Sequence, residues 1–155
     1  MKTYILREIS EEQFARVGAL LQTLNAEAPP LDIIRLREIL VNDSFNLFIA
    51  EDENSLITGM LTLTICHTLA GSKYWIEDVV VDPAHRGKGI GRALVRAAVN
   101  YVKENEPFPT IYLTSNPSRV TARSLYMSEG FEEYDTGVFR IKINCINLRV
   151  QIKDI

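Results

Sequence analysis

The chain has 155 residues, of which 46% are hydrophobic, which suits a single domain with a buried core spanning residues 1–155. Its formal net charge of -3 disfavours a general nucleic-acid-binding protein. The start of the chain lacks the pattern of a signal peptide, and no apolar run is long enough to cross a membrane, so we expect no membrane partner. Cys66 and Cys145 lack His or Cys neighbours at ligand spacing, so no disulfide framework or metal site is indicated and a reducing cytoplasm fits best.

The first predicted elements in chain order are two helices. Ser10 followed by Gln13 is a capping-box pattern, and apolar residues at helical spacing then predict a helix over residues 11–25. After a proline-containing break, Asp32 is placed to cap a second, short helix over residues 33–40.

Three strands and a long helix follow. The strands are predicted at residues 45–52, 55–70 and 73–82, and the first two form an antiparallel hairpin. Pro83 ends the third strand. A glycine-rich stretch then leads into an amphipathic helix that ends before Pro107.

The last third of the chain completes the predicted layer. It contains a short buried strand at 110–116, a helix at 118–130 closed by Gly130, and a hairpin of residues 131–135 and 138–144. This order predicts an α+β fold, or a mixed α/β layer, with one parallel step crossed by a helix. The tail, residues 145–155, is either a further edge strand or an oligomer contact, as in a homodimer.

Basic charge is concentrated in the segment from Arg86 to Arg123. This segment holds seven basic and two acidic residues, so it carries +5 and the remainder of the chain carries -8. Charge alone allows two interpretations, a solvated helix face or a binding site for a small polyanion.

The glycine-rich stretch favours the second interpretation. Gly87, Gly89 and Gly91 lie at the start of the predicted helix, where the first N–H groups lack partners and carry partial positive charge. Glycines let a large anion approach these donors and permit positive φ, and three basic side chains lie beside them: Arg86, Lys88 and Arg92. The stretch therefore predicts a phosphate or pyrophosphate site, with a tight packing turn as the structural alternative. The glycine spacing fits neither the Rossmann fingerprint nor the P-loop, which weakens a nucleotide-binding interpretation.

Two motifs resemble those of the GNAT superfamily of N-acyltransferases. RGKGIG resembles the acyl-CoA-binding motif of that family, and RVTARSLYMSEGF resembles its second motif. The resemblance covers residues 45–143. It implies a GNAT-like fold, in which a mostly antiparallel twisted sheet of six to seven strands is flanked by about four helices. It also implies an acetyl-CoA-dependent N-acetyltransferase without a metal, in which a primary amine of a small molecule or peptide attacks directly through a tetrahedral intermediate.

The resemblance also implies a set of acetyl-CoA-binding residues. The backbone of Val79 and Val81 would hold the pantetheine arm, with an N–H near Val79 as the oxyanion donor. The family often has asparagine seven residues before the motif tyrosine, where this chain has Arg119; either Asn116 supplies the amide or Arg119 reaches a phosphate. The full expected set is Val79, Val81, Arg86, Gly87, Lys88, Gly89, Ile90, Gly91, Arg92, Asn116 and Arg119.

Acyl transfer to an amine needs a base, because an alkyl ammonium loses its proton only near pH 10. Glu77 and Asp78 are charged residues within an apolar strand, where alternation predicts that they point to opposite faces. This strand and loop also resemble those of glucosamine-6-phosphate N-acetyltransferases, in which the counterpart of Glu77 is implicated in activating the amine. Glu77 is therefore the first candidate base and Asp78 the second, and a carboxylate that simply faces solvent is the structural alternative.

Tyr126 is the candidate acid that protonates the leaving thiolate, with a purely structural role in the core as the alternative.

The acceptor pocket is expected outside both motifs, where acidic residues would suit a cationic acceptor: Glu27, Asp32, Glu132, Glu133 and Asp135. The alternative function is a non-catalytic acyl-CoA-binding or sensor module, against which the presence of Glu77 and Tyr126 counts.

Overall fold

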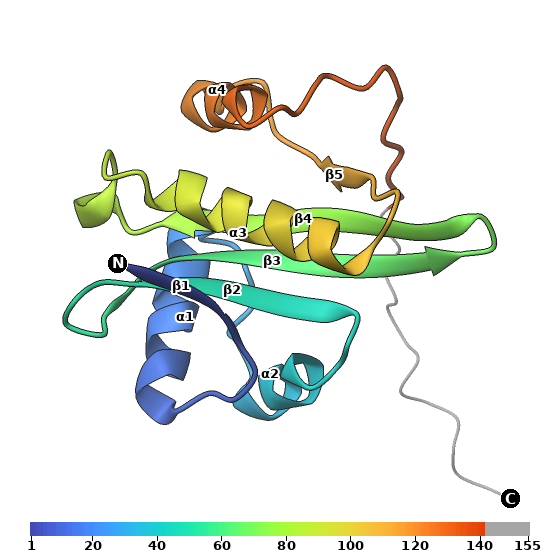
Figure 1. Ribbon diagram of the computed structural model, residues 1–155. Helices are drawn as coiled ribbons and strands as arrows, with labels where there is room; N and C mark the ends of the chain where they lie inside the picture. Colours follow the sequence, from blue (N-terminus) through green and yellow to red (C-terminus); the bar gives the residue numbers. More distant parts are fainter. Residues whose placement is uncertain (142–155) are drawn as a thin grey trace, which may run out of the picture.

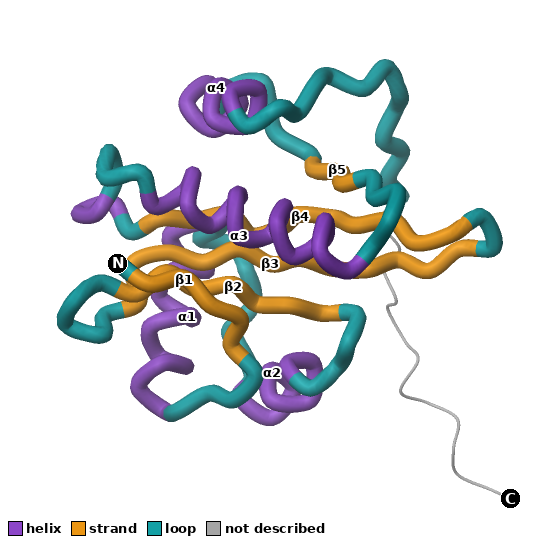
Figure 2. The backbone as a smooth tube through the Cα atoms, viewed as in Figure 1, coloured by secondary structure: helices purple, strands orange, loops and turns teal. Residues whose placement is uncertain are grey.

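The computed structural model of the chain describes residues 1–141 as a central sheet with helices on both faces (Figures 1 and 2). The elements in order are β1 (Lys2–Leu6), α1 (Glu11–Leu24), α2 (Ile33–Leu40), β2 (Phe45–Glu51), β3 (Ile57–Thr68), β4 (Gly71–Val81), a 3₁₀ turn η1 (Pro83–His85), α3 (Ile90–Asn105), β5 (Ile111–Leu113) and α4 (Val120–Ser128). No helix within these 141 residues has the length and apolar character needed to span a bilayer.

The sheet has the strand order β1-β2-β3-β4-β5. Each of the first three pairs is antiparallel, whereas β4 and β5 are parallel and are connected through α3. The predicted mixed layer with one parallel, helix-crossed step is therefore confirmed.

The strand count differs from the prediction at both ends of the chain. β1 was not predicted, and it pairs along its whole length with β2, from Lys2 opposite Glu51 to Leu6 opposite Leu47. The predicted hairpin is wrong for residues 131–141, which form no strand, so the described sheet has five strands rather than six or seven. The alternating pattern in this segment specifies a strand's faces but not a pairing partner. Residues 142–155, including the tail with its predicted strand or oligomer contact, lie outside the described part.

Local signals placed the helix ends correctly. At α1, the Gln13 N–H donates to Ser10 Oγ (3.2 Å) and the Ser10 N–H donates to Gln13 Oε1 (3.1 Å), which completes the capping box. At α2, Asp32 Oδ1 accepts from the Arg35 N–H at 2.9 Å. After α4, Gly130 has a φ of 91° and its N–H donates to Met127, as in a Schellman cap.

Two hydrophobic clusters lie on opposite faces of the sheet. α3 and α4 cover one face, where the buried residues include Leu94, Val95 and Ile76. α1 and α2 cover the other, where they include Leu20, Leu36 and Val80. In Figure 1, α3 lies in front of the sheet and α1 lies behind it. β4 therefore contributes side chains to both clusters, Ile76 to one and Val80 to the other.

Candidate active site

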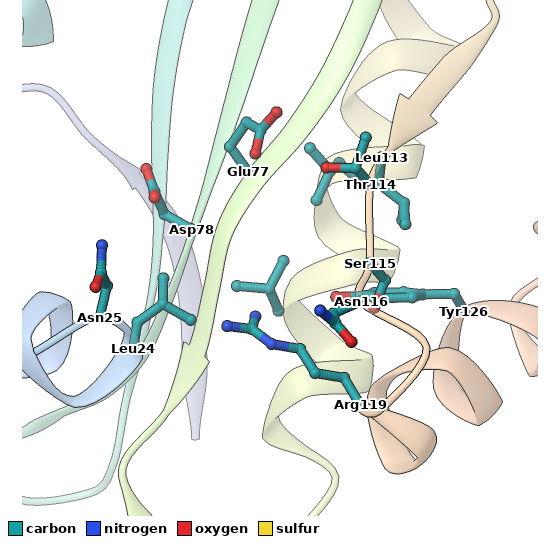
Figure 3. Close-up of a pocket in the computed structure, with 12 residues that line it drawn as sticks. Leu24, Asn25, Glu77, Asp78, Leu113, Thr114, Ser115, Asn116, Arg119 and Tyr126 are labelled. Atoms are coloured by element: carbon teal, nitrogen blue, oxygen red, sulfur yellow. The ribbon is translucent and has the colours of Figure 1, made fainter. Parts of the chain in front are cut away.

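β4 and β5 pair only over a short distance and then part. Tyr74, Trp75 and Ile76 are paired with Ile111, Tyr112 and Leu113, whereas β4 continues alone to Val81. A cavity of about 410 Å³ opens where the strands separate. Its lining comes from β4, the β5–α4 connection, α4 and the end of α1 (Figure 3): Leu24, Asn25, Ile76, Glu77, Asp78, Val79, Leu113, Thr114, Ser115, Asn116, Arg119 and Tyr126.

A β-bulge interrupts β4 at this cavity. Thr62 of β3 lies opposite Glu77, whereas Met60 lies opposite Val80. Two residues of β4, Asp78 and Val79, thus face a single residue of β3. Asp78 has a φ of 50°, in the left-handed region that Asp tolerates better than most side chains.

The bulge shifts the alternation of side chains along β4. Ile76 and Val80 would share a face in a regular strand, yet Ile76 packs on the α3 side and Val80 on the α1 side. Glu77 is paired in register with Thr62, and Asp78 Oδ2 accepts a hydrogen bond of 2.9 Å from Thr62 Oγ1. Both carboxylates therefore lie on the α1 side and line one cavity, so the predicted opposite orientation is wrong.

The two carboxylates differ in their electrostatic setting. The Glu77 carboxyl lies in the cavity, and partial burial, followed by the charge of Asp78, raises its pKa above the ordinary value. The raised pKa makes Glu77 a stronger base at neutral pH than a fully hydrated glutamate. Asp78 is held by Thr62 and lies on the same side of β4 as Leu24 and Asn25 at the end of α1 (Figure 3).

Tyr126 contributes the wall opposite the carboxylates. It is 9% exposed and packs edge-to-face on Phe131, with ring centroids 6.0 Å apart. Burial raises the pKa of the Tyr126 hydroxyl above its ordinary value. The charge of Arg119 lowers this pKa by a smaller amount, and the charge of Glu77 raises it. The phenol therefore keeps its proton at neutral pH. Tyr126 is thus both a core residue and a potential proton donor.

The β5–α4 connection supplies further polar groups. Asn116 Oδ1 accepts from the backbone N–H (2.9 Å) and the hydroxyl (2.8 Å) of Ser118, and the Asn116 amide N–H groups have no acceptor among residues 1–141. The Arg119 side chain extends toward β4 (Figure 3). Ser115 Oγ is buried without a hydrogen-bond partner within residues 1–141. Sequence reasoning missed Ser115, because one serine after a short strand carries no distinguishing signal.

The glycine loop leads into the first turn of α3. Gly87 and Gly89 both have a φ of 76°, and a Cβ added at either would meet no heavy atom within 4 Å. Gly89 is the N-cap of α3 and makes no side-chain cap, so the first-turn N–H groups, from Ile90 onward, remain open. Gly91 differs, because its added Cβ would lie 3.3 Å from Leu125 Cδ2. Gly91 thus permits close packing of α3 and α4.

The basic residues of this region divide into two groups. Arg86 and Lys88 are exposed on the glycine loop, where Arg86 Nε donates to the Val81 carbonyl at 3.4 Å. Arg92 instead reaches α4, and its Nε lies 3.0 Å from the Glu129 carboxylate. Arg96 donates to the same carboxylate at 2.7 Å. Direct anion binding by Arg92 therefore stays a prediction, because Glu129 competes with an anion for the Arg92 guanidinium.

The predicted acidic lining of the acceptor pocket is partly engaged elsewhere. Asp32 caps α2, and Glu133 forms an ion pair with Arg123. Within residues 1–141, no three metal-ligating side chains come together as a group.

Comparisons with known proteins agree with this geometry. Residues 5–131 match the Acetyltransferase (GNAT) family. A mycothiol acetyltransferase from Renibacterium salmoninarum is 33% identical over 106 residues, which are 67% of this chain and 31% of that protein. The uncharacterized N-acetyltransferase YhfO of Bacillus subtilis is 34% identical over 111 residues, 70% of this chain and 72% of that protein. Human N-acetyltransferase 8B is 26% identical over 65% of this chain, which spans only 44% of it.

Solved structures show the same fold. A putative acetyltransferase from Agrobacterium tumefaciens str. C58 aligns with 92% of this chain and 100% of its own, with a TM-score of 0.77 and 25% identity. An aminoglycoside acetyltransferase from an uncultured soil metagenomic sample aligns with 92% of this chain and 96% of its own, with a TM-score of 0.80 and 22% identity. The family match spans most of the chain and includes both the parted strands and the glycine loop, and the chain therefore belongs to the Acetyltransferase (GNAT) family.

Proposed function

We propose that this chain, as one domain over residues 1–155, is an N-acetyltransferase that moves the acetyl group of acetyl-CoA to a primary amine of a small molecule or peptide. The observation that carries the proposal is the cavity between β4 and β5, in which Glu77 lies on one wall and Tyr126 on the other. The open start of α3 follows β4 after the turn η1 and the glycine loop. Donor and acceptor groups can therefore meet from opposite faces of the sheet.

The glycine loop fits the pyrophosphate of acetyl-CoA. Open first-turn N–H groups and two glycines with positive φ form an anion-binding cradle that a Cβ would narrow. Arg86 and Lys88 add full positive charges at its rim. The pantetheine arm would then follow the unpaired part of β4, where the backbone of Val79 and Val81 offers hydrogen bonds.

The reaction needs one base, one oxyanion donor and one acid. Glu77 takes a proton from the ammonium, directly or through water, and Asp78 is the second candidate for this role. The amine nitrogen bonds to the acetyl carbonyl carbon, and the backbone N–H near Val79 stabilises the oxyanion. As the C–S bond breaks, the Tyr126 hydroxyl gives its proton to the thiolate, and the nitrogen loses its second proton, which returns through water to the Tyr126 phenolate. Glu77 passes its own proton to solvent, so both side chains are restored.

A thiol-release assay with acetyl-CoA and a panel of amines tests the proposal. The panel contains amino sugars, polyamines, amino acids, peptides and arylalkylamines, and the expected result is CoA release that depends on the amine. Glu77→Gln should remove most of this release while acetyl-CoA still binds. If acetyl-CoA binds but no amine releases thiol, the chain is the non-catalytic acyl-CoA-binding module.

A further inference from the structure

The face of the sheet toward α1 carries a row of aromatic side chains beside the candidate base. Phe45 of β2 is in register with Thr64 of β3, Thr64 with Trp75 of β4, and Trp75 with Tyr112 of β5. These residues therefore lie side by side across four strands, on one face. The Trp75 and Tyr112 rings are stacked, with centroids 5.2 Å apart and planes inclined by 27°.

Tyr134 extends this row beyond the last strand. It lies in the irregular segment after α4 and meets Tyr112 edge-to-face, with centroids 6.1 Å apart. Tyr134 is 68% exposed, so its ring is accessible to a ligand. Trp75, Tyr112 and Tyr134 together form what we term the aromatic shelf.

The aromatic shelf lies next to the active-site cavity. Its three residues line a second cavity, of about 950 Å³. The two cavities share four residues, namely Leu113, Thr114, Ser115 and Tyr126. Trp75 precedes Glu77 by two residues on the same strand face, so their side chains start about 6–7 Å apart.

Within residues 1–141, α1 does not cover the sheet face at the shelf, because the helix ends before it. Arg16, in the first half of α1, forms an ion pair with Asp82 beyond the end of β4. Leu24 and Asn25, at the other end of α1, line the cavity beside Asp78. α1 therefore stops level with the two carboxylates and does not reach Trp75, which stays half-buried.

The charges around the shelf favour an uncharged occupant. Lys73 lies two residues before Trp75 on the same strand face and is exposed, so a second cation on the shelf would meet like charge. The carboxylates next along β4, Glu77 and Asp78, are needed by the reacting ammonium. The second cavity is also lined by two basic residues, Lys103 and Arg123. Of its three acidic residues, Glu129 and Glu133 are paired with arginines and Glu132 is exposed.

We propose that the aromatic shelf binds the body of the acceptor, and that the acceptor is a primary amine with an aromatic or similarly flat apolar group two or three carbons from its nitrogen. The ring stacks against Trp75 and Tyr112 while the amine reaches Glu77. This inference rests on the proposed acetyltransferase function.

Matched amines and matched variants test the inference. The probes are 2-phenylethylamine, propylamine and 1,3-diaminopropane, and kcat/KM is measured by thiol release. We expect kcat/KM for 2-phenylethylamine to be about tenfold higher than for either of the other two amines. Trp75→Leu should lower kcat/KM for 2-phenylethylamine by about three- to tenfold and leave the values for the other two amines unchanged. Phe108→Leu is the control, because Phe108 is 95% exposed and lines neither cavity. A preference for the diamine, or an equal loss for all three amines in Trp75→Leu, overturns the inference.

A binding measurement separates this inference from the proposed function. Trp75 is the only tryptophan of the chain. Fluorescence excited at wavelengths that tryptophan absorbs and tyrosine does not therefore reports on the shelf alone. A saturable change with 2-phenylethylamine but not with 1,3-diaminopropane supports the shelf even if no thiol is released, in which case only the transfer reaction fails. Acetylation without any saturable change leaves the transferase proposal intact and overturns the shelf.

Discussion

Replacing Gly89 should weaken acetyl-CoA binding beyond what its effect on folding explains. Gly89 caps α3 with a φ of 76°, and an added Cβ would meet no heavy atom within 4 Å. The cost of Gly89→Ala to the folded protein is therefore backbone strain without a clash, about 1–2 kcal/mol. Gly89→Asn should cost less, because asparagine tolerates the left-handed region.

The two variants should differ in stability but lose acetyl-CoA affinity to a similar extent. Either side chain at Gly89 would occupy the space through which a pyrophosphate reaches the first-turn N–H groups of α3. Loss of one hydrogen bond to a charged group corresponds to about tenfold or more in the dissociation constant. Both variants should therefore bind acetyl-CoA at least about tenfold more weakly, although only Gly89→Ala is clearly destabilised.

Urea unfolding and calorimetric titration with acetyl-CoA measure the two quantities separately. Gly91→Ala is the stability control, because its Cβ would press only on the end of the Leu125 side chain and alanine favours a helix by about 1 kcal/mol. Its free energy of unfolding should stay close to that of the wild type. If Gly89→Asn binds acetyl-CoA as tightly as the wild type, the start of α3 is not the anion site and the reasoning fails.

Three further predictions concern titratable side chains. Tyr126→Phe should lower kcat by about a hundredfold or more with little change in acetyl-CoA affinity; unchanged turnover in a steady-state assay would assign thiolate protonation to another group. The raised Glu77 pKa means that the folded state disfavours the ionised carboxylate, and this destabilisation develops as pH rises through the folded-state pKa. Glu77→Gln should therefore slightly stabilise the fold at pH 7 while reducing activity. Equal melting curves for the two proteins at pH 7 would contradict this. Glu129 has a lowered pKa through hydrogen bonding and charge from Arg96 and the charge of Arg92, so its stabilisation is present above its ordinary pKa and lost as pH falls. Glu129→Gln should accordingly lower Tm at pH 7 by more than at acidic pH, and an equal difference at both would contradict the pairing.

Features that depend on neighbours in the chain could be predicted from the sequence. The capping box of α1, the Asp32 cap of α2 and the cap at Gly130 each use groups within a few residues of one another. The positive φ of Gly89 also follows from the demand of a tight turn into a helix. The same local patterns carried the family resemblance, which the match over residues 5–131 confirms.

Features that depend on strand pairing could not be predicted. The pairing of β1 with β2, the absence of a strand in residues 131–141 and the bulge at Asp78 are each decided by which backbone groups of distant segments meet. The bulge alone reversed the expected orientation of one carboxylate, since a single extra residue inverts the alternation of all that follow.

The sequence by itself determined the helix ends, the open donors of one helix and the residue types that acyl transfer needs, because these arise from short-range sterics and hydrogen bonding. Only the tertiary structure decided that Glu77 and Asp78 share a cavity with Tyr126, that Arg92 pairs with Glu129, and that Trp75 and Tyr112 stack on the same strand face as Glu77. Those relations are set by register and packing between segments far apart in the chain, and a local sequence pattern carries no information about which distant segments meet.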